Sequence, residues 1–275
     1  MRPHAIAAVA VAAPAVALAG GNSPGFATLD RTGDATAAGA ALTWLNVDAL
    51  DEGGQRIELY GQWLADGGLG AYASLSAARA TAAGDANTAL GNLEIAAVWA
   101  APRAPLRSIV RAGVALATAG DTVDDAFANL QAAQARITDA PATITGDVTW
   151  LRVAASPRAV RGRGTVRVDL GVDVPVAGDG RADANTWLRV NAAAGIDTGS
   201  VAAGIEWTNR IAVDRVDRGD DRLLHELALS VRYLRAGRLQ PFVALALPLD
   251  GPGADLLNWA AIAGAEWTFA RARAR

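Results

Sequence analysis

The stretch TVRVDLGVDVPV, residues 165–176, alternates apolar and polar positions over its whole length. Every even-numbered position carries Val or Leu, and the odd-numbered positions include Arg167, Asp169 and Asp173. Side chains of an extended strand point alternately to its two faces, so this alternation predicts a β-strand with one apolar and one polar face. The apolar face would point inward in a soluble barrel and outward, toward lipid, in a membrane barrel.

Composition narrows the classes of protein that the chain can belong to. At 275 residues it has the length of one large all-β domain or of two ordinary domains. The net charge of −3 gives no electrostatic footprint for binding nucleic acid. The absence of cysteine excludes disulfides, thiol catalysis and thiolate metal sites.

The N-terminus has the pattern of a secretory signal. Arg2 precedes an apolar run over residues 5–19, which ends in Ala17-Leu18-Ala19, the small-x-small pattern that signal peptidase cleaves. A buried N-terminal helix is the alternative interpretation of the same residues. We therefore expect a signal peptide at 1–19, a lead-in at 20–34 and a barrel at 35–270.

The rest of the chain consists of short amphipathic segments separated by residues that favour turns. This spacing predicts about twelve strands joined in chain order as an antiparallel up-and-down barrel. Trp150 and Leu151 compete for the same face, so we expect a bulge beside them. The predicted strands are 35–47, 55–65, 69–79, 89–100, 106–118, 144–154, 165–176, 185–196, 200–213, 224–235, 238–249 and 259–270.

One segment, DTVDDAFANLQAAQARITD at 121–139, has helical rather than strand periodicity. Its apolar residues recur every three or four positions, and Asp121 or Thr122 can cap its start. We expect a short helix inside a long outer connection, packed against the barrel rim. A helix that binds a partner or a membrane is the alternative.

The connections between the predicted strands alternate in length. If the N-terminus of the mature chain starts on the periplasmic side, the external connections are the longer set, as in outer-membrane barrels. A β-sandwich gives no reason for this pattern. The external connections are then 48–54, 80–88, 119–143, 177–184, 214–223 and 250–258, and the inner turns are 66–68, 101–105, 155–164, 197–199 and 236–237.

Aromatic residues gather near both ends of the predicted strands. Such belts are selected by the two interfaces of a bilayer. Trp150 and Trp207 fall in mid-strand and do not fit a belt. The predicted belts consist of Trp44, Trp187 and Trp259 at the outer interface, and of Trp63, Trp99, Trp267 and Phe269 at the inner interface.

The polar faces of the strands carry acidic residues and arginines together. In a barrel that faces lipid, these side chains would line the lumen and pair across neighbouring strands. The alternative is the ordinary solvated surface of a soluble sheet. The candidate lumen-lining residues are Glu58, Tyr60, Glu94, Arg111, Arg167, Asp169, Asp173, Arg189, Glu206, Arg210, Glu226, Arg232 and Glu266.

Two C-terminal stretches carry a family resemblance. AAIAGAEWTF at 260–269 alternates and closes on the aromatic Phe269, and LSVRYLRAGRLQPFVALALPLDGP at 229–252 has the form of a penultimate hairpin. In these features the chain resembles bacterial outer-membrane porin and transporter barrels. The resemblance implies that the barrel-assembly machinery reads the last strand. Here further residues follow Phe269, which leaves 271–275 as an Arg-rich tail.

Candidate catalytic and metal-binding residues are few. Outer-membrane phospholipase barrels use a His and a Ser two residues apart, because an imidazole base must reach its nucleophile. His225 is the single histidine after the predicted signal, and no serine lies two residues away. The acidic loops 214–221 and 121–125 could hold a divalent cation, but carboxylates paired with neighbouring arginines are the simpler interpretation.

Barrels of about twelve strands are wider than eight-stranded ones, whose side chains fill the interior, and narrower than large porins. We therefore predict a channel or transporter in the outer membrane of a Gram-negative bacterium that passes small polar solutes or ions. We expect no cofactor, no metal and no enzymatic activity. A closed barrel with a structural, adhesion or loop-mediated binding role is the alternative, and a barrel hydrolase is a third. The expected partners are outer-membrane lipid, the assembly machinery and an unidentified polar solute.

Overall fold

The computed structural model describes residues 26–47, 54–82, 85–101, 106–119, 142, 145–213, 223–234, 238–250 and 257–269. The predicted signal peptide at 1–19, the predicted helix at 121–139 and the predicted tail at 271–275 lie outside these residues. Within the described residues, a single 3-10 turn, Asp179–Ala182, interrupts the strands and their connections. No helix in this part of the chain is long and apolar enough to cross a membrane.

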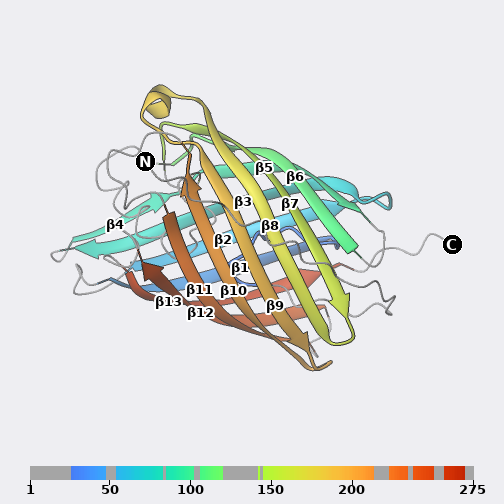
Figure 1. The fold of residues 1–275 in the computed structure, drawn as a ribbon. Helices are drawn as coiled ribbons and strands as arrows, with labels where there is room; N and C mark the ends of the chain where they lie inside the picture. The colour runs from blue at the N-terminus through green and yellow to red at the C-terminus, as the bar shows by residue number, and fades with distance from the viewer. Residues whose placement is uncertain are drawn as a thin grey trace, which may run out of the picture.

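The strands form one closed antiparallel barrel (Figure 1). Neighbours along the chain pair with one another, except that β4 and β5 both pair with β3, and β1 also pairs with β13, which closes the ring. The strands are β1 (Ala37–Val47), β2 (Gly54–Leu64), β3 (Leu69–Ala82), β4 (Asp85–Leu90), β5 (Leu93–Ala101), β6 (Leu106–Leu116), β7 (Thr149–Arg161), β8 (Gly164–Ala177), β9 (Trp187–Asp197), β10 (Val201–Ala212), β11 (Leu223–Tyr233), β12 (Leu239–Asp250) and β13 (Leu257–Thr268).

β4 and β5 share one position in the barrel. β4 pairs with residues 77–82 of β3, and β5 pairs with residues 69–74 of the same strand. The sheet of 13 strands is therefore a barrel of 12 positions, which confirms the predicted fold class.

Asn92 holds the break between β4 and β5. Its side-chain amide donates to the carbonyl groups of Ala142 (2.9 Å) and Thr145 (2.8 Å). Its Oδ1 accepts the N–H groups of Thr118 (2.9 Å) and Ala119 (2.8 Å). One buried amide thus ties the interrupted strand to residues on both sides of the longest connection in the chain.

Two connections differ from the sequence-based prediction. The expected loop at 80–88 is mostly strand, because β3 extends to Ala82 and β4 begins at Asp85. The expected turn at 155–164 lies largely within β7, which begins and ends later than the predicted strand 144–154. Pro157 lies within β7, opposite Ser108 of β6, at the point where the pairing of β7 with β8 is interrupted. The predicted bulge is present, between Thr149 and Trp150.

The two ends of the barrel differ in their connections. One end has the short connections 65–68, 102–105, 162–163, 198–200 and 234–238. The other end has 48–53, 117–148, 178–186, 213–222 and 251–256, together with the two residues that separate β3 from β4 in the chain. We call them the short-turn end and the long-loop end. This asymmetry is typical of outer-membrane barrels.

Burial alternates along the strands and settles which face points outward. In β8, Val166 and Leu170 are 53% and 48% exposed, whereas Arg167, Asp169 and Asp173 are buried. The apolar face of the alternating stretch therefore points away from the barrel and its charged face points inside. Exposed apolar side chains around buried charges are the inverse of a soluble barrel and match a transmembrane one.

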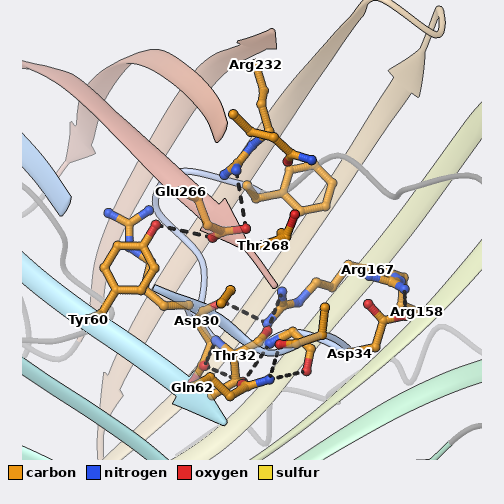
Figure 2. Close-up of a pocket in the computed structure, with 16 residues that line it drawn as sticks. Asp30, Thr32, Asp34, Tyr60, Gln62, Arg158, Arg167, Arg232, Glu266 and Thr268 are labelled. Carbon is orange, nitrogen blue, oxygen red and sulfur yellow. Dashed lines mark hydrogen bonds and ion pairs between the residues drawn. The ribbon is translucent and has the colours of Figure 1, made fainter. Parts of the chain in front are cut away.

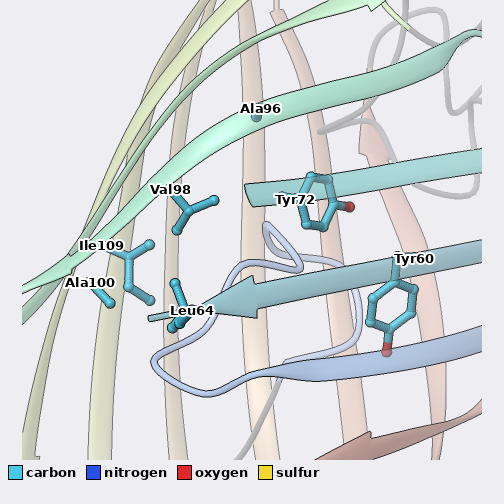
Figure 3. Close-up of a cluster of buried hydrophobic side chains, with 7 residues drawn as sticks. All are labelled: Tyr60, Leu64, Tyr72, Ala96, Val98, Ala100 and Ile109. Carbon is cyan, nitrogen blue, oxygen red and sulfur yellow. The ribbon is translucent and has the colours of Figure 1, made fainter. Parts of the chain in front are cut away.

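Part of the inner wall is apolar. A cluster of buried side chains covers the inside of β2, β3, β5 and β6 (Figure 3). It consists of Tyr60, Leu64, Tyr72, Ala96, Val98, Ala100 and Ile109. Leu64 and Ala100 lie close to the short connections, so this cluster extends to the short-turn end.

Leu59, 56% exposed at the middle of β2, tests the orientation of the barrel. We expect Leu59→Arg to destabilise the barrel in lipid, lowering its free energy of unfolding by about 2–4 kcal/mol, because it places a charge near the bilayer midplane. Urea titration in liposomes, followed by the gel shift of the folded barrel, measures this change. Leu59→Val is the matched control. In a soluble barrel the arginine would face water, so an unaffected variant would contradict the lipid-facing assignment.

Candidate functional site

The barrel interior gathers the charged residues that the alternation pattern singled out. All of them except the half-buried Glu266 are buried. They come from strands on every side of the barrel: Glu58, Tyr60, Glu94, Arg111, Arg167, Asp169, Asp173, Arg189, Glu206, Arg210, Glu226, Arg232 and Glu266.

Three further arginines on the wall are buried inside the barrel and were not among the candidate lumen-lining residues. The alternation of RIELYGQW already puts Arg56 on the same polar face as Glu58, and the structure buries both. Arg152 and Arg158 are buried on β7, whose predicted position was displaced along the chain. With β7 correctly placed, its even-numbered residues form the buried face, and both arginines follow from that phase.

Residues 26–36, which we call the inner segment, lie inside the barrel rather than in its wall. Phe26 through Asp30 are all buried, although none of them belongs to a strand. In the sequence these residues were only a lead-in, because nothing in their pattern indicates where they bind. Figure 2 shows the segment as a coil among the strands, with Asp30, Thr32 and Asp34 beside Gln62 and Arg167.

Glu206 in β10 anchors the start of the inner segment. Its Oε1 accepts the N–H of Ala27 (2.8 Å), and its Oε2 accepts the N–H groups of Thr28 (2.6 Å) and Leu29 (3.2 Å). The Thr28 hydroxyl donates to the same Oε2 (2.7 Å). Such charge-assisted bonds are about twice as strong as neutral ones, and a buried carboxylate without them would be costly. The segment and Glu206 therefore stabilise each other.

Apolar packing complements this anchor. Phe26 and Leu29 pack against Ala193 of β9, and Ala27 joins a cluster with Phe242 of β12. The wall also leaves room for the segment: a Cβ at Gly204 would lie 2.8 Å from the Phe26 ring. The inner wall is thus shaped to receive these side chains.

The backbone of Asp30 is bound on both sides. Asp169 accepts the Asp30 N–H at Oδ2 (3.1 Å), and Arg167 donates to the Asp30 carbonyl from Nη2 (2.9 Å). Arg167 also donates from Nε to Asp169 (2.7 Å) and from Nη1 to the Thr32 carbonyl (3.3 Å). The Arg167–Asp169 pair of β8 therefore grips the middle of the inner segment.

The Asp30 side chain enters an ion-pair network on the wall. Its Oδ2 lies 2.8 Å from Arg111 Nη2 and 3.8 Å from Arg189 Nη1. Its Oδ1 accepts the N–H and hydroxyl of Thr32 (2.9 and 2.6 Å). Arg111 and Arg189 lie on β6 and β9, so this one carboxylate bridges two separate strands.

The second half of the segment has polar contacts of its own. Arg31 pairs with Glu58 (3.2 Å) and lies over the Tyr60 ring at 5.0 Å. Gln62 accepts the Gly33 N–H (3.1 Å) and donates to the Gly33 carbonyl (2.8 Å). These contacts attach the segment to β2.

Asp34 binds the wall closer to the short-turn end. Its Oδ2 accepts from Arg107 Nη1 and from Arg158 Nη2, both at 2.7 Å. Asp34 retains 34% side-chain exposure, so solvent reaches this pair. The inner segment is thus held from its buried middle to a hydrated end.

A cavity of about 110 Å³ remains between the segment and the wall (Figure 2). Asp30, Arg31 and Asp34 line it from the segment. Arg232 and Glu266 line it from the barrel, 3.5 Å apart. Both signs of charge meet there, and the space is large enough only for water or a very small solute.

The aromatic residues divide between the two faces. Six of them are exposed on the outside of the barrel, near one or the other of its two ends. Trp44 and Trp259 lie toward the long-loop end, and Trp63, Trp99, Trp267 and Phe269 lie toward the short-turn end. Trp187 differs from its predicted place in the outer belt, because it shares the phase of Arg189 and lies inside over Arg210 at 4.6 Å.

Trp150 and Trp207, which fit no predicted belt, have different environments. Trp207 is exposed in the middle of β10. Trp150 is buried at the start of β7, and its indole N–H donates to the Thr145 hydroxyl (2.8 Å). Trp150 falls in the middle of the predicted strand 144–154 but at the start of β7, which begins at Thr149.

His225 lies opposite Asn209 in the β10–β11 ladder, with its Nδ1 3.0 Å from Asn209 Oδ1. Asn209 in turn donates from its side chain to the Val190 carbonyl and from its backbone N–H to Asn191 Oδ1, both at 2.9 Å. The imidazole thus contacts an amide that is itself bound to β9. The acidic loops near His225 and at 121–125 lie outside the described residues. Within the part of the chain described, no group of three acidic or histidine side chains could hold a metal.

The fold is similar to those of several solved outer-membrane proteins. The COG4313 outer membrane channel from Pseudomonas putida F1 matches with a TM-score of 0.61 and 11% identity, over 86% of this chain and 97% of that chain. The NanC porin matches with a TM-score of 0.55 and 7% identity, over 84% and 100%. The KdgM porin matches with 0.53 and 10%, over 85% and 99%, and another KdgM structure is in complex with disordered oligogalacturonate.

No protein-family model matches the sequence, and no curated protein matches it. At these identities the likeness to solved structures concerns the fold alone. The chain thus has the fold of outer-membrane porins.

Glu206→Gln tests the anchor of the inner segment. Because the chain has no cysteine, Leu29→Cys supplies a single buried reporter for a bulky maleimide. A neutral amide loses the charge in these bonds and turns one donor toward the backbone N–H groups, so we expect labelling about tenfold faster. Glu266→Gln, which does not contact residues 27–29, is the matched control. Equal labelling in the two variants would show that Glu206 is not the anchor.

The charges of the inner segment predict how its binding depends on pH. Burial opposes ionisation of Asp30, but Arg111, Arg189 and Arg167 outweigh it and hold its pKa well below the usual 3.8. Arg158 and Arg107 likewise outweigh burial and lower the pKa of Asp34. Carboxylates with lowered pKa values stabilise the bound state above their usual pKa, and this contribution is lost as the pH falls below it.

We therefore expect the hydrogen-exchange protection factors of residues 27–29 to stay constant between about pH 5 and pH 7 and to fall below about pH 3.5. Protection factors correct for the intrinsic pH dependence of exchange. A loss of protection near neutral pH would contradict the assigned ion pairs.

Proposed function

From the fold of an outer-membrane porin, we propose that this protein is an outer-membrane channel for small polar or charged solutes, closed here by its own inner segment. Two features support the proposal: the transmembrane barrel has a polar interior, and the segment that occupies this interior is not part of the wall. Removal of the segment would leave the barrel hydrogen bonds intact. The path would then be bordered by charged groups of both signs, which can set selectivity.

The observation that carries this proposal is the way in which the segment is bound. The side chains of Glu206, Arg167, Asp169 and Gln62, all in the wall, bind backbone N–H and carbonyl groups of the segment. Residues 26–36 themselves belong to no strand of the barrel. A segment held in this way can leave and rebind without unfolding the barrel. A barrel that is always closed can be filled by side chains of its own strands and needs no segment that can leave the interior.

The orientation follows from the asymmetry of the connections. In outer-membrane barrels the long loops face the exterior and the short turns face the periplasm. The signal peptide expected at 1–19 fits export, and the exposed Trp residues at both ends fit the two bilayer interfaces. We propose outer-membrane lipid and the barrel-assembly machinery, acting on the last strand, as partners, and we assign the protein no catalytic step.

The solute class is drawn from the interior charges. One structure of the KdgM porin is a complex with oligogalacturonate, an acidic oligosaccharide, and this supports a charged or polar solute for a barrel of similar fold. Here the wall carries arginines on β6, β7, β8, β9, β10 and β11. Acidic residues neutralise part of this charge, so the proposal extends to polar solutes in general.

A closed barrel with a structural or adhesion role is the second candidate. The interior ion pairs, the apolar cluster of Figure 3 and the inner segment together fill much of the barrel, which favours it. The two candidates differ in what remains after the segment is removed. A channel would open, whereas a structural barrel would stay closed.

Replacing residues 26–34 by a Gly/Ser sequence of equal length tests the proposal in planar bilayers. We expect the native protein to show small or rare openings, and the replacement to show stable openings with a conductance several-fold larger, because the segment loses its own ion-pairing and apolar side chains and keeps only its backbone contacts with the wall. The gel shift of the folded barrel controls for assembly. Silence of the folded replacement variant would refute the channel and favour the structural barrel.

A further inference from the structure

Six charged side chains form a closed ring in the barrel interior. Glu94 pairs with Arg111 (2.7 Å) and with Arg152, and Arg152 pairs with Asp173 (3.1 Å). Asp173 pairs with Arg189 (3.0 Å). Asp30 then joins Arg189 back to Arg111 (3.8 and 2.8 Å), so positive and negative groups alternate around the whole ring.

Asp30 is the one member of this ring that the wall does not supply. The other five lie on β5, β6, β7, β8 and β9. When the inner segment leaves, Arg111 and Arg189 lose the carboxylate between them while the rest of the ring stays in place. Both arginines are buried, so the wall would then present two guanidinium groups to the interior without their shared anion.

The surrounding charge favours an anion at that place. Four arginines meet in this network, because Arg210 also lies 3.5 Å from Asp173. With Asp30 they face three carboxylates, and without it they face two. Without Asp30 the network has an excess of positive charge, and an excess of one sign in a low-dielectric interior attracts ions of the opposite sign.

The arginines also have donors to spare. Within the described residues, Arg111 Nε and Arg189 Nε are buried and have no hydrogen-bond acceptor. A guanidinium group carries five N–H donors in a plane, which suits it to bind both oxygens of a carboxylate. A single oxygen of Asp30 lies between the two arginines and uses only part of this capacity, so a free carboxylate, whose orientation the chain does not restrict, can offer both of its oxygens to them.

We propose that Arg111 and Arg189 form a carboxylate-binding site of the channel, which Asp30 occupies as an internal ligand when the channel is closed. A solute carboxylate that enters the barrel competes with Asp30 for these two arginines and thereby releases the inner segment. Binding of an acidic solute and opening are then one coupled event. This inference deepens the proposed channel function and rests on it.

Acetate tests this site, because it is little more than a carboxylate. In the Leu29→Cys reporter, purified in detergent, we expect acetate to speed maleimide labelling in a saturable manner. Acetamide has the same size without the charge, and chloride at equal ionic strength controls for screening; neither should speed labelling. If sulfate or chloride matches acetate, the site is not selective for carboxylates and the proposal fails.

Two pairs of variants locate the effect. Asp30→Asn should raise basal labelling about tenfold and abolish the response to acetate, because no carboxylate remains to be displaced. Asp34→Asn changes the other acidic residue of the segment, outside the ring, and should keep the response. Arg189→Gln should lose the response, whereas Arg107→Gln, which pairs with Asp34, should keep it. A response that survives in Asp30→Asn, or that is lost equally in Arg107→Gln, would overturn the proposal.

The labelling experiment needs no ion current, so its outcome is separate from that of the channel proposal. A saturable acetate response together with a silent replacement of residues 26–34 would support the binding site and refute the channel. Conducting variants without any acetate response would support the channel and refute the site.

Discussion

The exclusion of charge from hydrocarbon is the constraint on which this structure depends. Each strand alternates, so it must expose one face to its surroundings and turn the other inside. A buried face that carries Arg and Asp, such as that of β8, is tolerable only where its charges pair with one another. Closure between β1 and β13 brings these faces together around one interior. Closing the barrel brings the charged side chains close enough to form ion pairs, and these ion pairs offset the cost of burying the charges.

The inner segment depends on the same chemistry. A wall lined with buried charged groups binds backbone N–H groups, carbonyls and carboxylates from any chain that enters, and residues 26–36 supply all three. The groups that hold the segment are therefore the groups that a polar solute would meet. Closure and solute binding compete for one set of side chains, which is the physical basis of both proposals above.

Much of the fold was predictable because alternation is a local property. Most of the strands, most of the inward charges and the bulge beside Trp150 follow from residue order alone, whereas β4 and the position of β7 do not. The errors have physical causes. The turn expected at 155–164 lies largely within β7, and Trp187, expected at the outer interface, shares the phase of Arg189 and lies inside the barrel. For Trp187, the two-residue period of the strand decides which face the side chain takes, whatever the preference of the residue type.

The sequence by itself determined that the strands have one apolar and one charged face, since that requires only the two-residue period of a strand. It also limited the chemistry, having no cysteine and few histidines. Only the tertiary structure decided that Asp30 completes an ion-pair ring with Arg111 and Arg189, which are far from it along the chain. Residues 26–36 have no periodicity of their own, and their place depends on a cavity that exists only once the barrel has closed.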